Sequence, residues 1–484
     1  MTTWNEQKLH QLFYRCDDVK IRSNGDRELV LVYCEGLCSN VMLKELAMNK
    51  SDSKQSAHHQ KDESGPMDHN SFLYSRLPDD VSDQVIIDEV FKGNLVMLDT
   101  KDGSLYQSNM ANRPERNPEE SQTELTVYGP RDSFIEQLTI NIALIRKRIS
   151  SNTLSCEMYT LGSRSRTSVA LLYLNDVLNE DIADNIRGKL QAIDVDSILN
   201  MEELKNIILK PGLGFFPLVN ITTRADMVVN SLMRGRFVIL MDGMPTAMLA
   251  PVNISYMMSA AEDAHTPLLL VYIVRAMRSA ALFITILLPG FWVALTSYHQ
   301  DQIPYPLLAT VAMATAGTPL SGPLEVLLMI LLFQFFLEAG SRLPSALGPS
   351  VSVVGGLIIG DAIIKAGLTS PATLVVAAVS ATAQFTLVTG MFGLSVGILR
   401  IYIYILSSFF GLFGFFTGAF SVLIYLSNLK SFGVPYLAPY SPFNWRDLRY
   451  VMFHFPRGKH QLTPRLLHTQ KDNYGQRGGD GDEA

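Results

Sequence analysis

Hydrophobic and polar positions follow two different regimes along this chain. Up to about Leu270, apolar residues come in short runs and helical periods separated by polar stretches, which is typical of soluble protein. From Ala280 to Leu429 the chain carries only seven charged side chains in about 150 residues, and Gly and Pro interrupt the apolar runs. Because a charge at the centre of a spanning helix costs several kcal/mol, this block predicts a polytopic membrane domain made of α-helices.

The polar half predicts two related α/β subdomains. Short apolar runs predict strands, and periodic apolar residues predict a helix over Glu180 to Ala192. The predicted strands are Leu29 to Tyr33, Asn94 to Leu98, Val169 to Leu174 and Phe237 to Met241. Asp102-Gly103 and Asp242-Gly243 are predicted as hairpin turns. A helix-like run, Asn40 to Asn49, and a polar insertion, Lys50 to Asn70, follow the first strand.

Short stretches of similar sequence in the two copies support the repeat. Leu31-Val-Tyr-Cys-Glu is similar to Leu172-Tyr-Leu-Asn-Asp, and Lys92-Gly-Asn-Leu-Val-Met-Leu to Arg234-Gly-Arg-Phe-Val-Ile-Leu. The first strand precedes the second by about 60 residues in each copy. The expected fold is therefore an α/β soluble N-terminal region of two related subdomains followed by an all-α polytopic membrane domain. The expected divisions are 1–120, 121–275, 276–430 and a cytoplasmic tail at 431–484.

A helical run from Phe134 to Ile149 lies between the two copies. Phe134, Leu138, Ile142 and Ile145 share one face, and Arg146-Lys147-Arg148 follows at the end. Basic residues in a last turn complement the helix dipole, which is the favoured interpretation. Contact with lipid headgroups or with a partner is the alternative.

The apolar block divides into several candidate spans. They are Ala280 to Tyr298, Pro323 to Leu337, Val351 to Ala366, Ala372 to Thr389 and Ser395 to Asn428, with a shorter piece at Tyr305 to Gly317. Basic residues flank both ends of the block, which predicts cytoplasmic ends and an even number of crossings. The five longer spans alone would give an odd number of crossings. The number becomes even if Tyr305 to Gly317 also crosses, or if the last span breaks into two near Gly411, Gly414 and Gly418.

The span Val351 to Ala366 carries the candidate pore residues. Ser352, Gly356 and Gly360 recur every four residues and form a small-residue ridge for helix packing. A different face carries Val354, Ile358, Asp361 and Lys365. In a ring of several copies, the first two would form a hydrophobic constriction and the last two a charged mouth. From the residues alone, an i,i+4 pair of Asp361 with Lys365 at the headgroups, with lipid-facing Val354 and Ile358, is favoured.

Other polar residues occur in or near the spans. Glu338 and Arg342 stand four apart and are expected as a polar pair or as a polar turn. Arg400 is expected to snorkel to the interface. Ser380 and Gln384 share a helix face, and helix-to-helix hydrogen bonding is favoured over a wet path.

Composition excludes several classes of protein. The net charge of -6 is not gathered into a basic stripe, so nucleic acid is not an expected partner. The four cysteines are too few and too irregular for a disulfide framework, and Cys34 with Cys38 lacks a second ligand pair for a metal. Phosphate-binding, dinucleotide-binding, zinc-protease and serine-hydrolase motifs are missing, so neither an enzyme nor a cofactor is expected. The first 20 residues lack a secretory signal.

With these elements in place, the chain resembles the A subunits of the GerA-type nutrient receptors that trigger germination of bacterial endospores. The resemblance runs from about Thr126 to Phe443. It is carried by Val127-Tyr-Gly-Pro-Arg-Asp-Ser-Phe, Asn141-Ile-Ala-Leu-Ile-Arg-Lys-Arg-Ile, Glu338-Ala-Gly-Ser-Arg-Leu-Pro, Val354-Gly-Gly-Leu-Ile-Ile-Gly and Ser431-Phe-Gly-Val-Pro-Tyr-Leu-Ala-Pro. An acidic-aromatic patch expected after the last soluble strand is reduced to Glu262-Asp263-Ala-His265.

The resemblance implies a multi-pass protein of the spore inner membrane with cytoplasmic N- and C-terminal regions. Its implied partners are a transporter-like, nutrient-binding B subunit and a lipoprotein C subunit. It further implies a homo-oligomeric, ligand-gated channel that releases monovalent cations. With this resemblance, a ring in which the pore candidates face a shared axis becomes as well supported as the interpretation in which Val354 and Ile358 face lipid. A secondary transporter is the main rival, although the membrane half lacks the paired inverted repeats of that class. A non-conducting scaffold of the receptor complex is the third interpretation.

Overall fold

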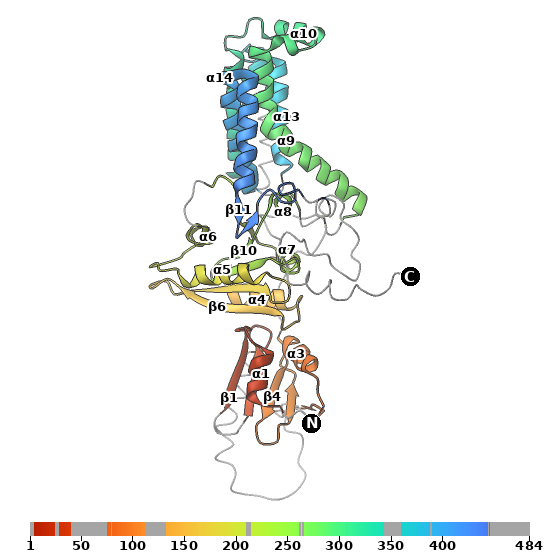
Figure 1. The fold of residues 1–484 in the computed structure, drawn as a ribbon, viewed down its shortest axis with the longest axis vertical. Coiled ribbons are helices and arrows are strands. Elements are labelled where there is room, and N and C mark those ends of the chain that lie inside the picture. Colours follow the sequence, from red (N-terminus) through yellow and green to blue (C-terminus); the bar gives the residue numbers. More distant parts are fainter. Residues whose placement is uncertain are drawn as a thin grey trace, which may run out of the picture. The chain divides into compact units, whose positions relative to one another are not determined.

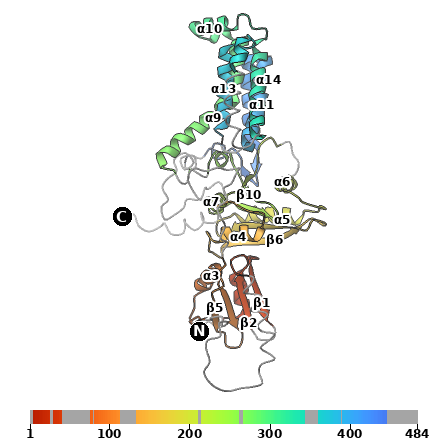
Figure 2. The same ribbon diagram turned by 180° about the vertical axis from the view of Figure 1, so that it is seen from behind.

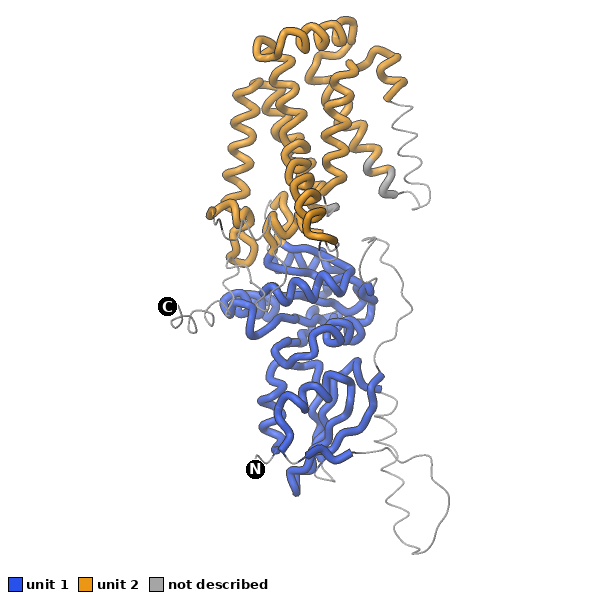
Figure 3. The backbone as a smooth tube through the Cα atoms, turned by 90° about the vertical axis from the view of Figure 1, so that its right-hand side faces the viewer, with its two compact units in different colours: residues 1–211, 219–251, 459–484 blue, residues 212–218, 252–458 orange. Residues whose placement is uncertain are grey.

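A computed structural model describes most of the chain. It covers residues 4–24, 29–39, 75–78, 80–112, 132–209, 214–260, 263, 266–342, 360–387, 390–443 and 445. The predicted helix Asn40 to Asn49 and the insertion Lys50 to Asn70 lie outside these residues. The chain divides into two units (Figure 3). Among the described residues, the first unit takes in those of 1–211 and 219–251, and the second those of 212–218 and 252–458.

The first half of the first unit is a five-stranded antiparallel sheet (Figure 1). Its strands are β1 Val19–Asn24, β2 Leu29–Cys34, β3 Ser75–Arg76, β4 Leu95–Asp99 and β5 Leu105–Ser108, in the order β1-β2-β4-β5-β3. The helices α1 Glu6–Leu12 and α3 Asp83–Phe91 accompany it. Apolar residues from the sheet and from both helices form one core. We call the described residues of 4–112 subdomain A.

The second half repeats the same topology. Its strands are β6 Leu154–Leu161, β7 Thr167–Leu174, β8 Asn220–Thr222, β9 Phe237–Met241 and β10 Ala247–Ala250, in the order β6-β7-β9-β10-β8. Its helices are α4 Leu138–Arg146, α5 Glu180–Gln191, α6 Met201–Leu209 and α7 Ala225–Leu232. We call the described residues of 132–251 subdomain B.

The predicted repeat is confirmed strand by strand. Strands β2 and β7 occupy the second place in their sheets, and β4 and β9 the third. Each of the last two is followed by a hairpin that turns at Gly103 or Gly243, where φ is 66° and 79°. Glycine takes this left-handed conformation without the steric cost of a Cβ atom.

The amphipathic period of α5 explains how this helix docks. Asn179 caps the first turn, because its side chain accepts a hydrogen bond from the Asp181 amide. Ile182, Ile186 and Leu190 are buried, as their spacing predicts.

The second unit is mainly helical (Figures 1 and 2). Its described elements are α8 Ile254–Met257, α9 Leu268–Tyr298, the short 3-10 helix η2 Gln300–Gln302, α10 Tyr305–Thr315, α11 Gly322–Arg342, α13 Pro371–Phe385, α14 Gly390–Asn428, and the strands β11 Lys430–Ser431 and β12 Val434–Pro435. Helix α9 packs against α11, α13 and α14. Within the described part of the chain, two helices are long and apolar enough to cross a bilayer: α9, and residues Met391–Asn428 of α14.

Helix α14 breaks at Gly411, where φ is 58° and ψ is -138°. The two legs fold back on each other. The hydroxyl groups of Tyr402 and Ser421 lie 3.0 Å apart, and Gly418 packs against Ile403. Of the two alternatives that the sequence left open, the break in the last apolar segment is therefore observed, and the segment is a helical hairpin with legs of about 31 and 25 Å.

Candidate functional site

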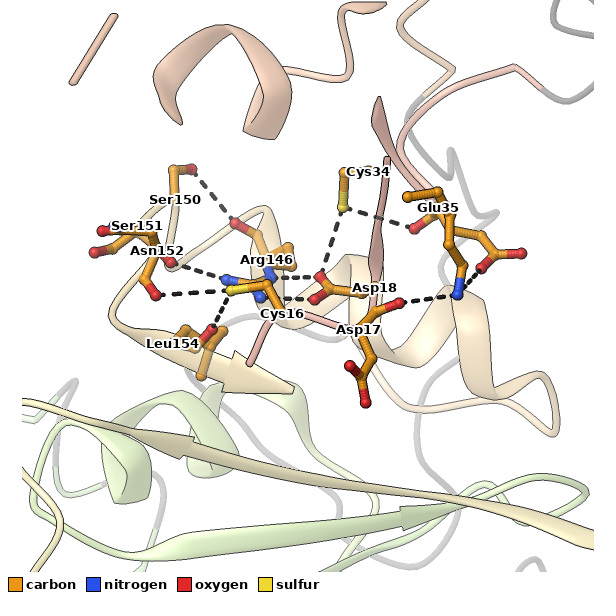
Figure 4. Close-up of polar contacts among 11 residues, drawn as sticks. Cys16, Asp17, Asp18, Cys34, Glu35, Arg146, Ser150, Ser151, Asn152 and Leu154 are labelled. Carbon is orange, nitrogen blue, oxygen red and sulfur yellow. Dashed lines mark hydrogen bonds and ion pairs between the residues drawn. The ribbon is translucent and has the colours of Figure 1, made fainter. Parts of the chain in front are cut away.

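The polar centre of the first unit is a buried ion pair between its two subdomains (Figure 4). Arg146 ends helix α4 in subdomain B, and Asp18 directly precedes β1 in subdomain A. The Arg146 Nε lies 2.6 Å from Asp18 Oδ2, and Nη2 lies 2.8 Å from Oδ1. Their side chains are 0% and 3% exposed. This bidentate geometry fits a guanidinium to a carboxylate.

The third nitrogen and the flat face of the Arg146 guanidinium also have partners inside the protein. Its Nη1 donates to the Ser151 carbonyl at 2.8 Å, and the guanidinium stacks on the Phe91 ring with 4.5 Å to the centroid. Burial opposes the charge of Arg146, but the facing Asp18 outweighs burial and raises the pKa of Arg146. Arg146 does lie in the last turn of α4, as the favoured interpretation has it. The alternative, contact with lipid headgroups or with a partner, is wrong for Arg146, because its side chain is buried on Asp18. Arg148 pairs with Asp132 nearer the surface.

Three buried thiols surround the pair. Cys34 Sγ donates to Asp18 Oδ2 at 3.6 Å, and Cys16 Sγ donates to the Leu154 carbonyl at 3.5 Å. Burial is the main cause that raises the pKa of Cys16 to about 11, and it raises that of Cys34 and Cys156 as well. Thiols in this state are poor nucleophiles and poor metal ligands. In the described ranges, no group of three or more His, Cys, Asp or Glu side chains could hold a metal ion.

Backbone hydrogen bonds extend the joint along the free edge of β6. The Asp17 amide donates to the Cys156 carbonyl at 2.9 Å, and the Cys156 amide donates to the Arg15 carbonyl at 2.8 Å. Asp17 Oδ2 accepts from the Met158 amide at 2.8 Å. The edge strand of one sheet is thus covered by the other subdomain, which suits a rigid connection and supplies no reactive group.

Sequence reasoning missed Asp18, because one acidic residue ahead of a strand carries no periodic signal. Arg146 itself could have indicated that an acidic partner exists. Helix α4 is buried nearly all round, so a charge at its end needs an internal partner.

The structure describes only some of the candidate pore and packing residues. Ser352, Val354, Gly356 and Ile358 lie outside the described residues. Asp361 and Lys365 are exposed and form an i,i+4 ion pair at 2.7 Å. Gly360 faces Leu374 of α13, whose side chain would lie 3.8 Å from a Cβ atom at that position. Both members of the other polar pair, Glu338 and Arg342, lie in the last turns of α11, and Glu338 is exposed.

The polar residues of α13 join helices together. Ser380 Oγ donates to the Thr285 carbonyl of α9 at 3.2 Å, and Thr285 Oγ1 donates back to the Ser380 carbonyl at 3.5 Å. Gln384 Nε2 donates to the Gly393 carbonyl at 3.0 Å. The favoured interpretation, hydrogen bonding between helices, is confirmed for both Ser380 and Gln384.

Arg400 does not snorkel, contrary to the prediction. It is 2% exposed in the first leg of α14, and its Nη2 donates to the amide oxygen of Gln334 at 3.4 Å. Its Nε has no hydrogen-bond partner among the described residues. The wrong prediction followed from the position of Arg400 near the start of an apolar run, which does not reveal which helix face is covered by α11.

Asp263, which precedes α9, forms a charge cluster with two arginines of that helix. Asp263 Oδ1 lies 3.0 Å from Arg278 Nη1, and its Oδ2 lies 3.2 Å from Arg275 Nε. Asp263 therefore holds the second and third turns of α9 to the segment that precedes the helix.

The fold and these contacts define a protein with two repeated α/β subdomains, joined by a buried ion pair, and an apolar helical unit. The model of the Bacillus/Clostridium GerA spore germination protein family matches residues 7–466. The chain belongs to this GerA family.

Individual relatives agree with the family match. Spore germination protein XA of Bacillus anthracis is 38% identical over 481 residues, which is 98% of this chain and 97% of that protein. Spore germination protein KA of Bacillus subtilis (strain 168) is 30% identical over 459 residues, 93% of this chain and 82% of that protein. Spore germination protein GerLA of Bacillus cereus is 31% identical over 385 residues, 80% of this chain and 78% of that protein.

One solved structure is also similar. It is the crystal structure of the N-terminal domain of the A subunit of the Bacillus megaterium spore germinant receptor GerK3. The similarity covers 52% of this chain and 94% of that one, with 21% sequence identity and a TM-score of 0.35. A TM-score this low supports no conclusion on the fold.

Proposed function

We propose that this chain is the A subunit of a spore germination receptor and that several copies form a nutrient-gated channel for monovalent cations. The observation that carries the first part is the family match over residues 7–466, joined by relatives that are named spore germination proteins. The proposed partners are a transporter-like B subunit that holds the nutrient and a lipoprotein C subunit. The chain acts in signalling and not as an enzyme.

Exposed apolar side chains support a bilayer around the helical unit. Phe409, Phe413 and Phe420 are 72%, 74% and 62% exposed on the hairpin α14. Such rings facing water would oppose folding, whereas lipid accepts them. The proposed location is the spore inner membrane, with several crossings and with both terminal regions on the cytoplasmic, spore core side.

A path for cations between copies is favoured over a path within one copy. Arg400 places a buried positive charge between α11 and the first leg of α14, and a cation that moved past it would be repelled. Ser380 and Gln384, which could have lined a wet path, are occupied by contacts between helices.

The proposed gate is the face of Val354, Ile358, Asp361 and Lys365, repeated around a shared axis. The two apolar residues would close the pore by excluding water, and the charged pair would form its mouth. The ridge of Ser352, Gly356 and Gly360 would pack against other helices, and Glu338 with Arg342 would form a polar pair at the end of α11.

The mass of the purified full-length protein in detergent tests the shared pore. A closed oligomer of several subunits is expected, because one helix per copy must line a common axis. A monomer that persists at high protein concentration and together with the B and C subunits would contradict the ring and would return the choice to a transporter or a scaffold.

A further inference from the structure

A buried carboxylate in the helical unit has no role in the features described so far. Glu325 lies in the first turn of helix α11 and is 1% exposed. Between Ala280 and Leu429, Glu325 and Arg400 are the charged side chains that the structure describes as buried. Because an ionisable side chain inside an apolar helical unit is costly, its surroundings indicate what it binds.

The two carboxylate oxygens of Glu325 have different surroundings. Oε2 accepts a hydrogen bond from the backbone amide of Ser370 at 3.2 Å. Ser370 is the N-cap of helix α13, so the carboxylate faces the positive end of that helix dipole, which favours the charged form. Oε1 is closed off from solvent and has no hydrogen-bond partner among the described residues. One side of a buried carboxylate is therefore left without a partner.

The end of α13 does not balance the whole charge of Glu325. A helix N-terminus is equivalent to roughly +0.5 elementary charge, which is about half of what a carboxylate needs. Arg400, the buried cation of the same unit, contacts Gln334, which follows Glu325 by nine residues and therefore lies about 13.5 Å further along α11. The remaining negative charge at Glu325 calls for a small cation close to Oε1.

The first turn of α13 supplies further oxygen atoms. Thr369, Ser370 and Thr373 are all buried, and each carries a hydroxyl group. Ser370 Oγ lies 3.0 Å from Thr373 Oγ1, in the same turn whose first amide binds Glu325. Carboxylate and hydroxyl oxygens are ligands of hard cations, whereas softer metals prefer nitrogen or sulfur. The described residues around Glu325 therefore suit an alkali metal ion.

Other helices fix the first turn of α11 in place. The Tyr404 hydroxyl of α14 donates to the Pro323 carbonyl, two residues before Glu325. Val326, the residue after Glu325, is buried in a core with Val293 of α9 and with Tyr404. Because both neighbours of the carboxylate are held in this way, Glu325 cannot turn to solvent without opening the packing of α11.

We propose that Glu325 binds one monovalent metal cation, Na⁺ or K⁺, inside the helical unit of each copy, with the hydroxyl groups of Ser370 and Thr373 as further ligands. The ion connects the first turn of α11 to the first turn of α13. A single carboxylate matches a single charge, and a divalent ion would leave an excess positive charge buried there. The site holds an ion and is independent of the proposed channel, because a chain that conducts nothing can bind the ion equally well.

The test uses the purified full-length protein in detergent, at constant pH and ionic strength, with potassium, sodium or choline chloride as the salt. Thermal unfolding is followed as each metal salt replaces choline chloride, and binding of radioactive Rb⁺, an analogue of K⁺, is counted directly. Glu325→Gln removes the charge and keeps an oxygen that can accept from the Ser370 amide. Thr373→Val removes one proposed ligand, and Asp301→Asn is the control, at an exposed position of η2.

The proposal predicts that the unfolding temperature of the native protein rises with potassium or sodium chloride, because an ion that binds only the folded state stabilises it. The salt that acts at the lower concentration identifies the ion. Glu325→Gln should abolish the rise and the Rb⁺ binding assigned to this site. Thr373→Val should weaken the apparent affinity at least about fivefold, through the loss of one ligand, while Asp301→Asn should behave as the native protein.

Three results would overturn the cation site. The first is a native protein that unfolds at the same temperature in all three salts. The second is Rb⁺ binding that persists unchanged in Glu325→Gln, which would place the ion elsewhere. The third is stability that responds to pH in choline chloride but not to either metal ion, and that loses this response in Glu325→Gln, which would assign a proton to Glu325. If Glu325→Gln does not fold, native affinity in Thr373→Val contradicts the site instead.

Discussion

Asp18 and Arg146 meet across 128 positions of sequence in a bidentate ion pair that is closed off from solvent at the join of two repeated subdomains. The pair lies where helix α4 of subdomain B ends and strand β1 of subdomain A begins. Because neither charge can reach water, each one depends on the other. The two subdomains are thereby held in one arrangement.

Removing one partner of this pair is expected to destabilise the first unit strongly. Arg146→Met leaves a buried carboxylate without its cation, which costs about 3–5 kcal/mol. Arg148→Met is the matched control in the same basic cluster, and its partly exposed pair with Asp132 is worth about 0–1 kcal/mol. Pulse proteolysis of the full chain in urea measures both. Equal effects of the two substitutions would show that the Arg146 pair does not hold the subdomains together.

The buried thiols predict a pH dependence. Burial raises the pKa of Cys16 from its ordinary value of 9.0 to about 11, so the folded protein favours the neutral thiol. The unfolded chain ionises first, and the free energy of unfolding therefore falls as pH rises from about 9 to about 11. Cys16→Ala should flatten this slope. Rapid alkylation of Cys16 in the folded protein at pH 8 would contradict the burial.

The hairpin of α14 is expected to depend on Gly411. A Cβ atom there would lie 2.9 Å from the Tyr298 Cβ atom, and the positive φ adds strain. Gly411→Ala is therefore expected to cost more than about 3 kcal/mol. Gly367→Ala isolates the strain, because φ is +67° there and nothing lies within 4 Å; its cost should be about 1–2 kcal/mol. Thermal unfolding in detergent compares them, and equal losses would count against a hairpin packed on α9.

The buried Arg400 side chain is expected to lower the free energy of unfolding. Its guanidinium is buried against a neutral amide, so Arg400→Met should raise the free energy of unfolding by about 1–3 kcal/mol. Lys430→Met, at an exposed position of β11, should change it by less than about 0.5 kcal/mol. The measurement is thermal unfolding in detergent. A large loss of stability in Arg400→Met would contradict this account, because it would mean that the guanidinium is stabilised by an anionic partner.

The sequence predicted those features that follow from local patterns. Apolar runs identified β2, β4, β7 and β9, and the Asp-Gly turns identified two hairpins, because strand and turn propensities act over a few residues. The glycines of the last apolar segment indicated a break there as one of two alternatives, and helix α14 does break at Gly411. The charge-poor block from Ala280 identified the helical unit.

Features that depend on distant partners were not predictable. Arg146 and Arg400 both stand at helix positions where exposure is the usual outcome, and only packing from another element buries them. Phe216 lies in a short apolar run, Phe-Phe-Pro, that carries no periodic signal. Its three aromatic partners come from parts of the chain more than 170 residues away.

The most direct test of the central claim is potassium flux through vesicles that contain the complete receptor. Val354→Ala should make resting vesicles leak, because a smaller side chain lets water and ions into the constriction. The neighbouring Val353→Ala, on another face of the same expected helix, should remain as tight as the native receptor. Tight vesicles with Val354→Ala, or equal leaks from both variants, would contradict a gate at Val354 on a shared pore axis.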